Sequence, residues 1–405
     1  MLRRPSILLL VLLATPGAGL AQGRYQAAVR IGQVDSVFSA TLDEVRPYLV
    51  YTPPSYDAES AATQRFPVLY LLDGDAHFHS VSGLIQILGT GVNGTWAIPE
   101  MIVVAIPNTD RTRDLTPTHA AVGPDGEPAP GLGMESSGGN PAFFTFLQDE
   151  LIPRIEVDYR TMPYRVFVGH SLGGITALNA LYEIPDVFDA YVAIDPSLWW
   201  DREVLLRRAK DFFSTADLDG KALYVAQANT VSPDDTTANP HFSAITRFDA
   251  VMRAYDESGI RYGFRYYSED DHGSVPLIAE YDALRFIFDG YRVPLQRVMA
   301  DPPLLTAHYR AASERLGAPF QPPARLVLQL ASFSMAQDTA AALAFVDIGQ
   351  DLYPGDHNWP ELRGDVAAAR GETEAARRWY EEAAAKTEDP RHVREKIAHL
   401  GGEGR

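Results

Sequence analysis

A short apolar run that leads into a serine flanked by glycines is the feature that most restricts how this chain can fold. Residues 165–174 are Arg-Val-Phe-Val-Gly-His-Ser-Leu-Gly-Gly, and residues suited to a helix continue to Tyr182. Glycines two residues before and after the serine let a strand and a helix pack closely at a strained turn, where a Cβ would collide. This order predicts the nucleophile elbow of an α/β-hydrolase fold, with the Ser171 hydroxyl exposed above the sheet.

The N-terminus has the pattern of a secretory signal peptide. Two arginines precede an apolar run over residues 7–14, and small residues follow up to a cleavage site expected after Ala21. The apolar run is shorter than the roughly 20 residues that a spanning helix needs, so a membrane anchor is the weaker interpretation. We therefore expect residues 1–21 to be removed and the mature protein to be secreted, into the periplasm if the source is a Gram-negative bacterium.

The composition restricts the class of protein further. A chain of 405 residues with 46% hydrophobic content can bury a large core and has room for more than one domain. The absence of cysteine excludes disulfides, a thiolate nucleophile and a cysteine metal site. A formal net charge of −18 argues against a nucleic-acid partner, which would need a basic surface.

Residues 24–292 alternate between extended and helical patterns, which is typical of an α/β domain with a mainly parallel sheet. Besides the strand before Ser171, the expected strands cover residues 45–51, 66–72, 101–106, 189–194, 222–228 and 262–267. The expected helices lie near residues 141–152, 203–213, 243–257 and 275–291. Residues 115–140 lack hydrophobic periodicity, so we expect a long loop there, either a flap over the site or a tolerated surface insertion.

The C-terminal region, residues 293–405, is expected to be an all-helical extension. Within it, residues 342–390 have the apolar spacing of one tetratricopeptide-like helical hairpin, with Gly371 in the turn between its last two helices. One such repeat cannot bury both of its faces. It should therefore pack on other helices of this region or on a protein partner, unless it is only a stabilising cap.

His272 is the candidate general base. In this fold the chain order is serine, acid, histidine, and the histidine lies on a loop after the last strand. His272 lies between the expected strand at 262–267 and the closing helix, next to a glycine. Four other histidines fit less well, because they lie beside the serine, too early in the chain or before the last strand: His170, His77, His79 and His241.

The acid that orients the base is expected after the strand at 222–228. Asp234 and Asp235 are the candidates in that loop, although both could instead be solvated charges. A local alternative is one of the acidic residues just before the base: Glu269, Asp270 and Asp271. A dyad without a strong acid is also open, because the acid orients the imidazole and does not attack the substrate.

Two backbone N–H groups should stabilise the developing oxyanion. One is expected from Leu172, directly after the nucleophile. The other is expected from Asp75, where Gly74 lets the chain turn towards the site after the strand at 66–72.

Five segments together resemble the family named "Putative esterase", which includes esterase D-like enzymes, periplasmic siderophore esterases, feruloyl esterase domains and mycolyl transferases. They are Tyr-Leu-Leu-Asp-Gly at 70–74, Tyr-Arg-Thr at 159–161, the elbow at 169–174, Pro-Ser-Leu-Trp-Trp at 196–200 and Asp-His-Gly-Ser at 271–274. The resemblance covers roughly residues 30–292 and implies an α/β-hydrolase fold with Ser171 as nucleophile and His272 as base. The C-terminal helices and the lack of one obvious acid depart from the family's pattern.

The resemblance also suggests where substrate binds. Residues 108–114 look like the family's segment, so Arg111 and Arg113 are candidates to hold an anionic or catecholate substrate. Structural pairing of Arg113 with Asp114 or Asp73 is the alternative. Trp199, in the fourth of the five segments, is a third candidate for substrate contact.

These features predict a secreted serine carboxylic-ester hydrolase that works through an acyl-enzyme, without a metal or organic cofactor. By resemblance, its small-molecule substrate is a siderophore-type or aromatic ester. One alternative is an acyltransferase of the same fold. Another is an inactive exported scaffold protein whose helical region recruits a partner.

Overall fold

A computed structural model describes residues 28–90, 96–123, 127, 134–231 and 239–400. The expected signal segment therefore lies outside the described residues. Ile31–Arg405 form one compact unit. No helix among the described residues has the length and apolarity needed to cross a bilayer.

The larger unit is built on an eight-stranded sheet with the order β1-β2-β4-β3-β5-β6-β7-β8. β1 and β4 each pair with β2 in antiparallel fashion, and the other neighbours are parallel. The strands are β1 (Gln33–Ser39), β2 (Glu44–Tyr51), β3 (Phe66–Leu71), β4 (Ile102–Ala105), β5 (Thr161–His170), β6 (Ala190–Ile194), β7 (Ala222–Ala228) and β8 (Arg261–Tyr267). The expected mainly parallel α/β fold is confirmed.

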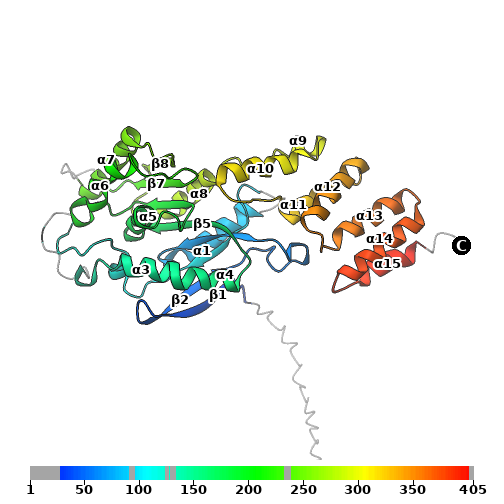
Figure 1. Cartoon of the computed structure of the whole chain (residues 1–405), viewed down its shortest axis with the longest axis horizontal. Helices are drawn as coiled ribbons and strands as arrows, with labels where there is room; N and C mark the ends of the chain where they lie inside the picture. The colour runs from blue at the N-terminus through cyan, green and yellow to red at the C-terminus, as the bar shows by residue number, and fades with distance from the viewer. Residues whose placement is uncertain (1–27, 91–95, 124–126, 128–133, 232–238, 401–405) are drawn as a thin grey trace, which may run out of the picture. The chain divides into compact units, whose positions relative to one another are not determined.

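Helices cover both faces of the sheet (Figure 1). Every residue of β3, β4, β6 and β7 is buried, as expected for parallel strands enclosed on two sides. Alternate strand residues join two separate apolar cores, one on each face. One core includes α1 (Gly74–Gly89) and α8 (Val275–Ile287), and the other includes α3 (Asn140–Phe146), α5 (Leu172–Glu183), α6 (Trp200–Phe213) and α7 (Pro240–Tyr255).

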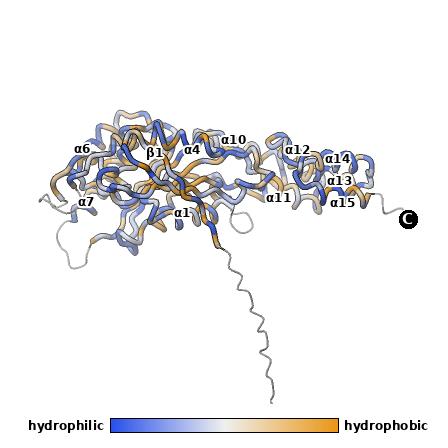
Figure 2. Tube along the Cα trace, turned by 90° about the horizontal axis from the view of Figure 1, so that it is seen from below, coloured by the Kyte–Doolittle hydropathy of each residue, from blue (hydrophilic) through white to orange (hydrophobic). Residues whose placement is uncertain are grey.

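The helical region shares a core with the α/β part. Side chains from its first five helices, including Tyr309, Phe345 and Trp359, belong to the same buried cluster as α1 and α8. Figure 2 shows apolar segments recurring along these helices, and the last helices share a smaller cluster. The helices are α9 (Leu295–Ala300), α10 (Leu304–Leu316), α11 (Ala324–Ser334), α12 (Thr339–Leu352), α13 (Asn358–Ala369), α14 (Thr373–Lys386) and α15 (Arg391–His399).

The expected hairpin corresponds to α12, α13 and α14, and Gly371 adopts a positive φ of 73° in the turn between the last two. A positive φ suits glycine, which explains its position there. Packing on other helices of the chain is thus what the structure shows for this segment. Kinship with tetratricopeptide repeats and a protein partner remain predictions.

Several elements differ from the sequence expectations. The helix expected at 141–152 consists of α3, a π-helical turn (Leu147–Leu151) and α4 (Ile152–Asp158). β1 was not anticipated, because it is an edge strand whose residues are mostly exposed and show no buried face. The segment expected as a long loop contains a short 3-10 turn, Met134–Ser136, and its Thr118 carbonyl accepts the Trp200 indole N–H at 3.1 Å. Its role as a flap remains a prediction.

Candidate active site

Ser171 lies at a strained turn between β5 and α5. Its φ of 60° and ψ of −114° are unfavourable for a residue with a side chain. A Cβ on Gly169 would lie 2.1 Å from the Gly173 carbonyl oxygen, and one on Gly174 would lie 3.0 Å from the Ile194 oxygen. Only glycines let the strand, the turn and the helix approach this closely, so the structure has the steric character of a nucleophile elbow.

The base predicted from the sequence lies within hydrogen-bond distance of this serine. His272 Nε2 is 3.1 Å from Ser171 Oγ, although the two residues are 101 positions apart in the chain. The other ring nitrogen, Nδ1, is 2.6 Å from Asp195 Oδ2. Serine, imidazole and carboxylate therefore form a continuous chain of contacts, the arrangement that nucleophilic catalysis by serine requires.

Asp195 directly follows β6, and its side chain is fully buried. Burial by itself would raise the pKa of this carboxyl, but hydrogen bonds from His241 and His272 outweigh that effect and hold the pKa well below its usual range. The carboxylate is therefore ionised and can only accept hydrogen bonds. It follows that His272 carries its proton on Nδ1, which leaves Nε2 free to accept the proton of Ser171.

Among the described residues, the carboxylate in contact with His272 follows a different strand from the acids expected from the sequence. Asp234 and Asp235 lie outside the described residues, and the carboxylate in contact with His272 is Asp195. The carboxyl ends of β6 and β7 are adjacent, since Asp195 N–H donates to the Ala226 carbonyl at 2.8 Å. An acid after either strand can therefore reach the same histidine. In the sequence, Asp195 lies between an apolar strand and Pro196, and this context could have identified it as a candidate acid.

Asp271, the acidic residue directly before the base, contacts the backbone of its own loop. Asp271 Oδ1 accepts the backbone N–H groups of Gly273 and Ser274, both at 2.9 Å. These contacts shape the loop that carries His272. Asp195, at the carboxyl end of β6, thus contacts and orients the base, while Asp271 stabilises the turn of the loop that carries it.

The rival histidines surround the base without replacing it. His241 Nε2 lies 2.8 Å from Asp195 Oδ2, so it contacts the acid. His170 packs against the His272 ring with centroids 4.4 Å apart, and burial lowers its pKa to about 4. His77 packs in turn against His170 with centroids 5.9 Å apart. Among these rings, the described contact with Ser171 Oγ comes from His272.

The two expected oxyanion donors both lie in the first turn of a helix. Leu172 begins α5 and Asp75 is the second residue of α1, where backbone N–H groups have no acceptor within their own helix. The two helix starts are close, since Asp73 Oδ2 would lie 3.2 Å from a Cβ on Gly173. Their use by an oxyanion remains a prediction that this geometry permits.

Arg111 lies beside the elbow but its charge is already paired. Its guanidinium donates to both oxygens of Asp73, at 2.6 and 3.0 Å, and one N–H lies 3.4 Å from the His170 carbonyl oxygen. The side chain is 35% exposed, so a substrate anion could still approach it. Trp199 is half-buried, two residues after Ser197, whose hydroxyl lies 3.3 Å from Ser171 Oγ. Substrate contact by either residue remains a prediction.

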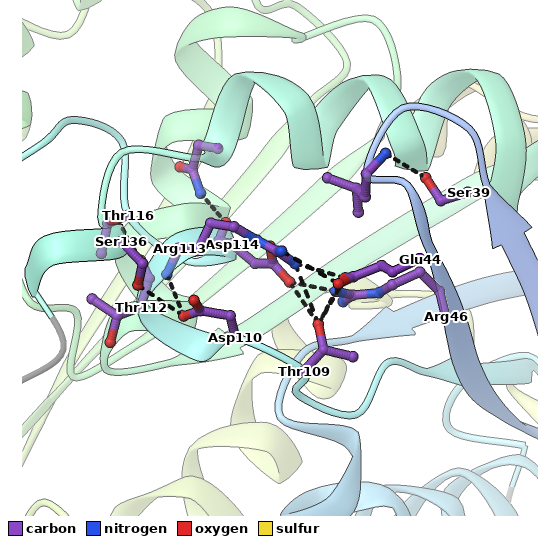
Figure 3. A network of polar contacts seen from close by, with 12 residues as sticks. Ser39, Glu44, Arg46, Thr109, Asp110, Thr112, Arg113, Asp114, Thr116 and Ser136 are labelled. Carbon is purple, nitrogen blue, oxygen red and sulfur yellow. Dashed lines mark hydrogen bonds and ion pairs between the residues drawn. The ribbon is translucent and has the colours of Figure 1, made fainter.

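Arg113 belongs to a structural network, as Figure 3 shows. Its guanidinium donates to Asp114 at 2.7 Å and to Glu44 at 2.6 Å. Arg46, which is almost fully buried, joins the same two carboxylates, at 2.5 and 2.8 Å. These contacts tie α2 (Arg111–Asp114) to β2 and show the structural pairing of Arg113 with Asp114 that the sequence left open. Substrate contact by Arg113 stays a prediction.

Glu44→Gln is expected to destabilise the protein in a pH-dependent way. Hydrogen bonds from Arg113, opposed in part by burial, lower the pKa of Glu44 from 4.5 to about 2. We expect the free energy of unfolding at pH 7 to fall by about 1 kcal/mol, since solvent screens partly exposed ion pairs. A lowered pKa contributes stability above the unfolded value of 4.5, and this contribution is lost as the pH falls towards 2.

Denaturant unfolding of both proteins at pH 7, 4 and 3 measures this difference. Glu314→Gln, at an exposed position on α10, is the control and should change little. A Glu44→Gln difference that stays constant or grows as the pH falls would contradict the assignment.

Two clusters in the described part of the chain place three metal-ligand side chains close together: Asp195, His241 and His272, and His357, Glu361 and His392. In the first, hydrogen bonds between the carboxylate and the two rings account for the arrangement. In the second, Lys396 Nζ lies 2.8 Å from Glu361 Oε1 and supplies a positive charge. Both arrangements are explained by protein contacts.

Comparisons with known proteins agree on one family. The "Putative esterase" family matches residues 39–242, a range that contains Ser171 and Asp195. Ferri-bacillibactin esterase BesA of Bacillus subtilis is 31% identical over 229 residues, 55% of this chain and 78% of that protein. Siderophore enterobactin esterase of Emericella nidulans is 29% identical over 243 residues, 51% of this chain and 77% of that protein. The crystal structure of an IroE-like serine hydrolase from Shewanella oneidensis is similar with a TM-score of 0.72 and 32% identity, covering 79% of this chain and 99% of that one.

Proposed function

Because the chain belongs to the "Putative esterase" family and is a carboxylic ester hydrolase, we propose that it cleaves siderophore-type esters through an acyl-enzyme on Ser171. The observation that carries this mechanism is the chain of contacts from Ser171 Oγ to His272 Nε2 at 3.1 Å and from His272 Nδ1 to Asp195 at 2.6 Å.

In the first half of the reaction, Ser171 Oγ attacks the ester carbonyl carbon while His272 Nε2 accepts the hydroxyl proton. Asp195 stabilises the resulting imidazolium, and the N–H groups of Leu172 and Asp75 bind the tetrahedral oxyanion. Collapse breaks the bond to the alcohol oxygen, which takes the proton from His272 as it leaves. The acyl group is then bonded to Ser171 Oγ.

In the second half, water replaces the alcohol. The water oxygen attacks the acyl carbon while His272 accepts a proton from the water molecule. When the bond between Ser171 Oγ and the acyl carbon breaks, His272 returns a proton to Ser171 Oγ. The products are a carboxylic acid, an alcohol and the regenerated enzyme. No redox step or further reactant is required.

Two lines of support lead to the substrate class. The relatives reported above are esterases named for siderophores, bacillibactin and enterobactin. In this chain, the side chain of Arg111 remains 35% exposed beside the elbow, where it can attract an anionic or catecholate substrate. Half-buried Trp199 offers an aromatic surface two residues beyond Ser197.

The test is hydrolysis of enterobactin, methyl ferulate and 4-nitrophenyl butyrate by the purified protein and by Ser171→Ala. We expect the highest kcat/KM for enterobactin and no activity of the variant on any of the three. Cleavage of the simple esters without cleavage of enterobactin would overturn the substrate class but not the mechanism. A competing alcohol acceptor distinguishes acyl transfer, because a transferase would form a new ester where a hydrolase releases the free acid.

We place the enzyme outside the cytoplasm on the basis of residues 1–21. The mature protein recovered from its source is then expected to begin at Gln22. Recovery of a chain that still carries residues 1–21 would contradict export by cleavage.

A further inference from the structure

We propose that His241 is a positioning residue of the active site, which holds Asp195 in the orientation that aligns His272 with Ser171. This inference rests on the proposed function, since it assigns His241 a role in the same reaction. His241 would neither touch substrate nor accept a proton from it.

The first observation is that two imidazoles share one carboxylate oxygen. His241 Nε2 and His272 Nδ1 lie 2.8 and 2.6 Å from Asp195 Oδ2, and the two rings are nearly perpendicular, at 89°. Because the ionised carboxylate can only accept, both nitrogens must donate. The Ala228 N–H donates to Oδ1 at 2.9 Å, so both carboxylate oxygens are fixed.

The second observation is that Asp195 depends on these donors. Its side chain has no exposure to solvent, so protein groups alone must stabilise the charge. Its backbone φ is 40°, in the left-handed region that is unfavourable for a residue with a Cβ. Such a conformation persists only where surrounding contacts enforce it. His241 supplies one of the three described hydrogen bonds to this carboxylate.

The third observation is that hydrogen bonds to the first turn of α7 fix the backbone position of His241. It is the second residue of α7, and Asn239 caps that helix by accepting the Phe242 N–H at 3.1 Å. The Gln227 side chain on β7 donates to the Phe242 carbonyl at 2.9 Å. The first turn of α7 is therefore attached to the strand beside β6, which sets the distance from His241 to Asp195.

A double-mutant cycle tests this role. His241→Leu removes the donor and should lower kcat by about ten- to a hundred-fold with KM nearly unchanged, comparable to losing an outer partner of a functional histidine. His241→Gln keeps an N–H at the same distance along the side chain and should restore most of kcat. In an Asp195→Ala background, His241→Leu should cause no further loss, because its effect passes through the absent carboxylate.

His308→Leu is the matched control. His308 is also half-buried and also makes one hydrogen bond, to the Tyr291 carbonyl at 3.0 Å, but it lies on α10. Its replacement should leave kcat within about two-fold of the parent. If His241→Leu fails to fold, His241→Asn takes its place, since the shorter amide cannot reach Asp195, and it should lose activity where Gln does not.

The outcomes separate this inference from the proposed function. An active Ser171→Ala would reject the serine mechanism itself. An inactive Ser171→Ala together with a normal kcat for His241→Leu or His241→Asn would reject only the positioning role. Equal losses for His241→Leu and His241→Gln, or a full additional loss in the Asp195→Ala background, would also reject it.

Discussion

Asp195→Asn is expected to lower kcat by about four orders of magnitude while the protein stays folded and KM changes little. The amide has nearly the same shape as the carboxylate but lacks its charge, so it cannot stabilise the imidazolium of His272. An amide N–H facing Nδ1 would also favour the tautomer with a proton on Nε2. That ring could no longer accept the proton of Ser171, with which it lies in contact at 3.1 Å.

Matched variants decide between Asp195 and the acids expected from the sequence. Asp234→Asn and Asp235→Asn should leave kcat within a few-fold of the parent, measured on the same ester and with the melting temperature as a check on folding. A large loss in either variant, together with an active Asp195→Asn, would show that the contact between Asp195 and His272 does not support catalysis.

Ser171→Ala is expected to cause the largest loss, about five to six orders of magnitude in kcat. Without Oγ no acyl-enzyme can form, and only binding and the oxyanion donors remain to accelerate attack by water. Alanine removes a single oxygen and should preserve the turn, so circular dichroism and melting temperature should match those of the parent.

Ser197→Ala is the control for Ser171→Ala, because Ser197 is the serine next to Ser171 in space. Ser197 Oγ lies 3.3 Å from Ser171 Oγ, close enough to test whether a second hydroxyl could act as the nucleophile. Ser197→Ala should retain activity within about ten-fold. A variant Ser171→Ala that keeps more than one per cent of the parent activity, with Ser197→Ala inactive, would move the nucleophile to Ser197.

The contact between Ser171 and His272 was predictable because each residue has a local signature. Glycines around Ser171 are required by the close approach at Gly169, and that requirement is visible in the sequence. His272 follows from the order of strands, since the loop after β8 lies at the same sheet edge as the elbow. The local sequence pattern and the strand order were together sufficient to predict that Ser171 and His272 lie close to each other.

The acid was not predictable in the same way, because its position depends on packing between neighbouring strands. Asp195 reaches His272 across 77 residues of sequence, and the ends of β6 and β7 offer equivalent starting points. The role of His241 depends on the same long-range packing. Arg113 was ambiguous for a related reason, since its partner Glu44 is 69 residues away and no spacing rule connects them.

The fold could be predicted to the extent that its segments are buried. Strands such as β7, whose residues are all buried, had their expected bounds, whereas β1 was missed because its residues are mostly exposed. The packing of the helical region on the α/β part could not be predicted from the sequence and is known only from the structure. Its apolar residues show that the helices need a covering surface, and only the shared core with α1 and α8 shows which surface that is.

A serine that His272 activates as a nucleophile reacts rapidly with a fluorophosphonate. The decisive experiment is therefore to label the purified protein with a fluorophosphonate and to locate the adduct by peptide mass spectrometry. We predict one adduct, on the peptide that contains Ser171, and at least a hundred-fold slower labelling in His272→Ala. An adduct on another serine, or equally rapid labelling after His272→Ala, would contradict it.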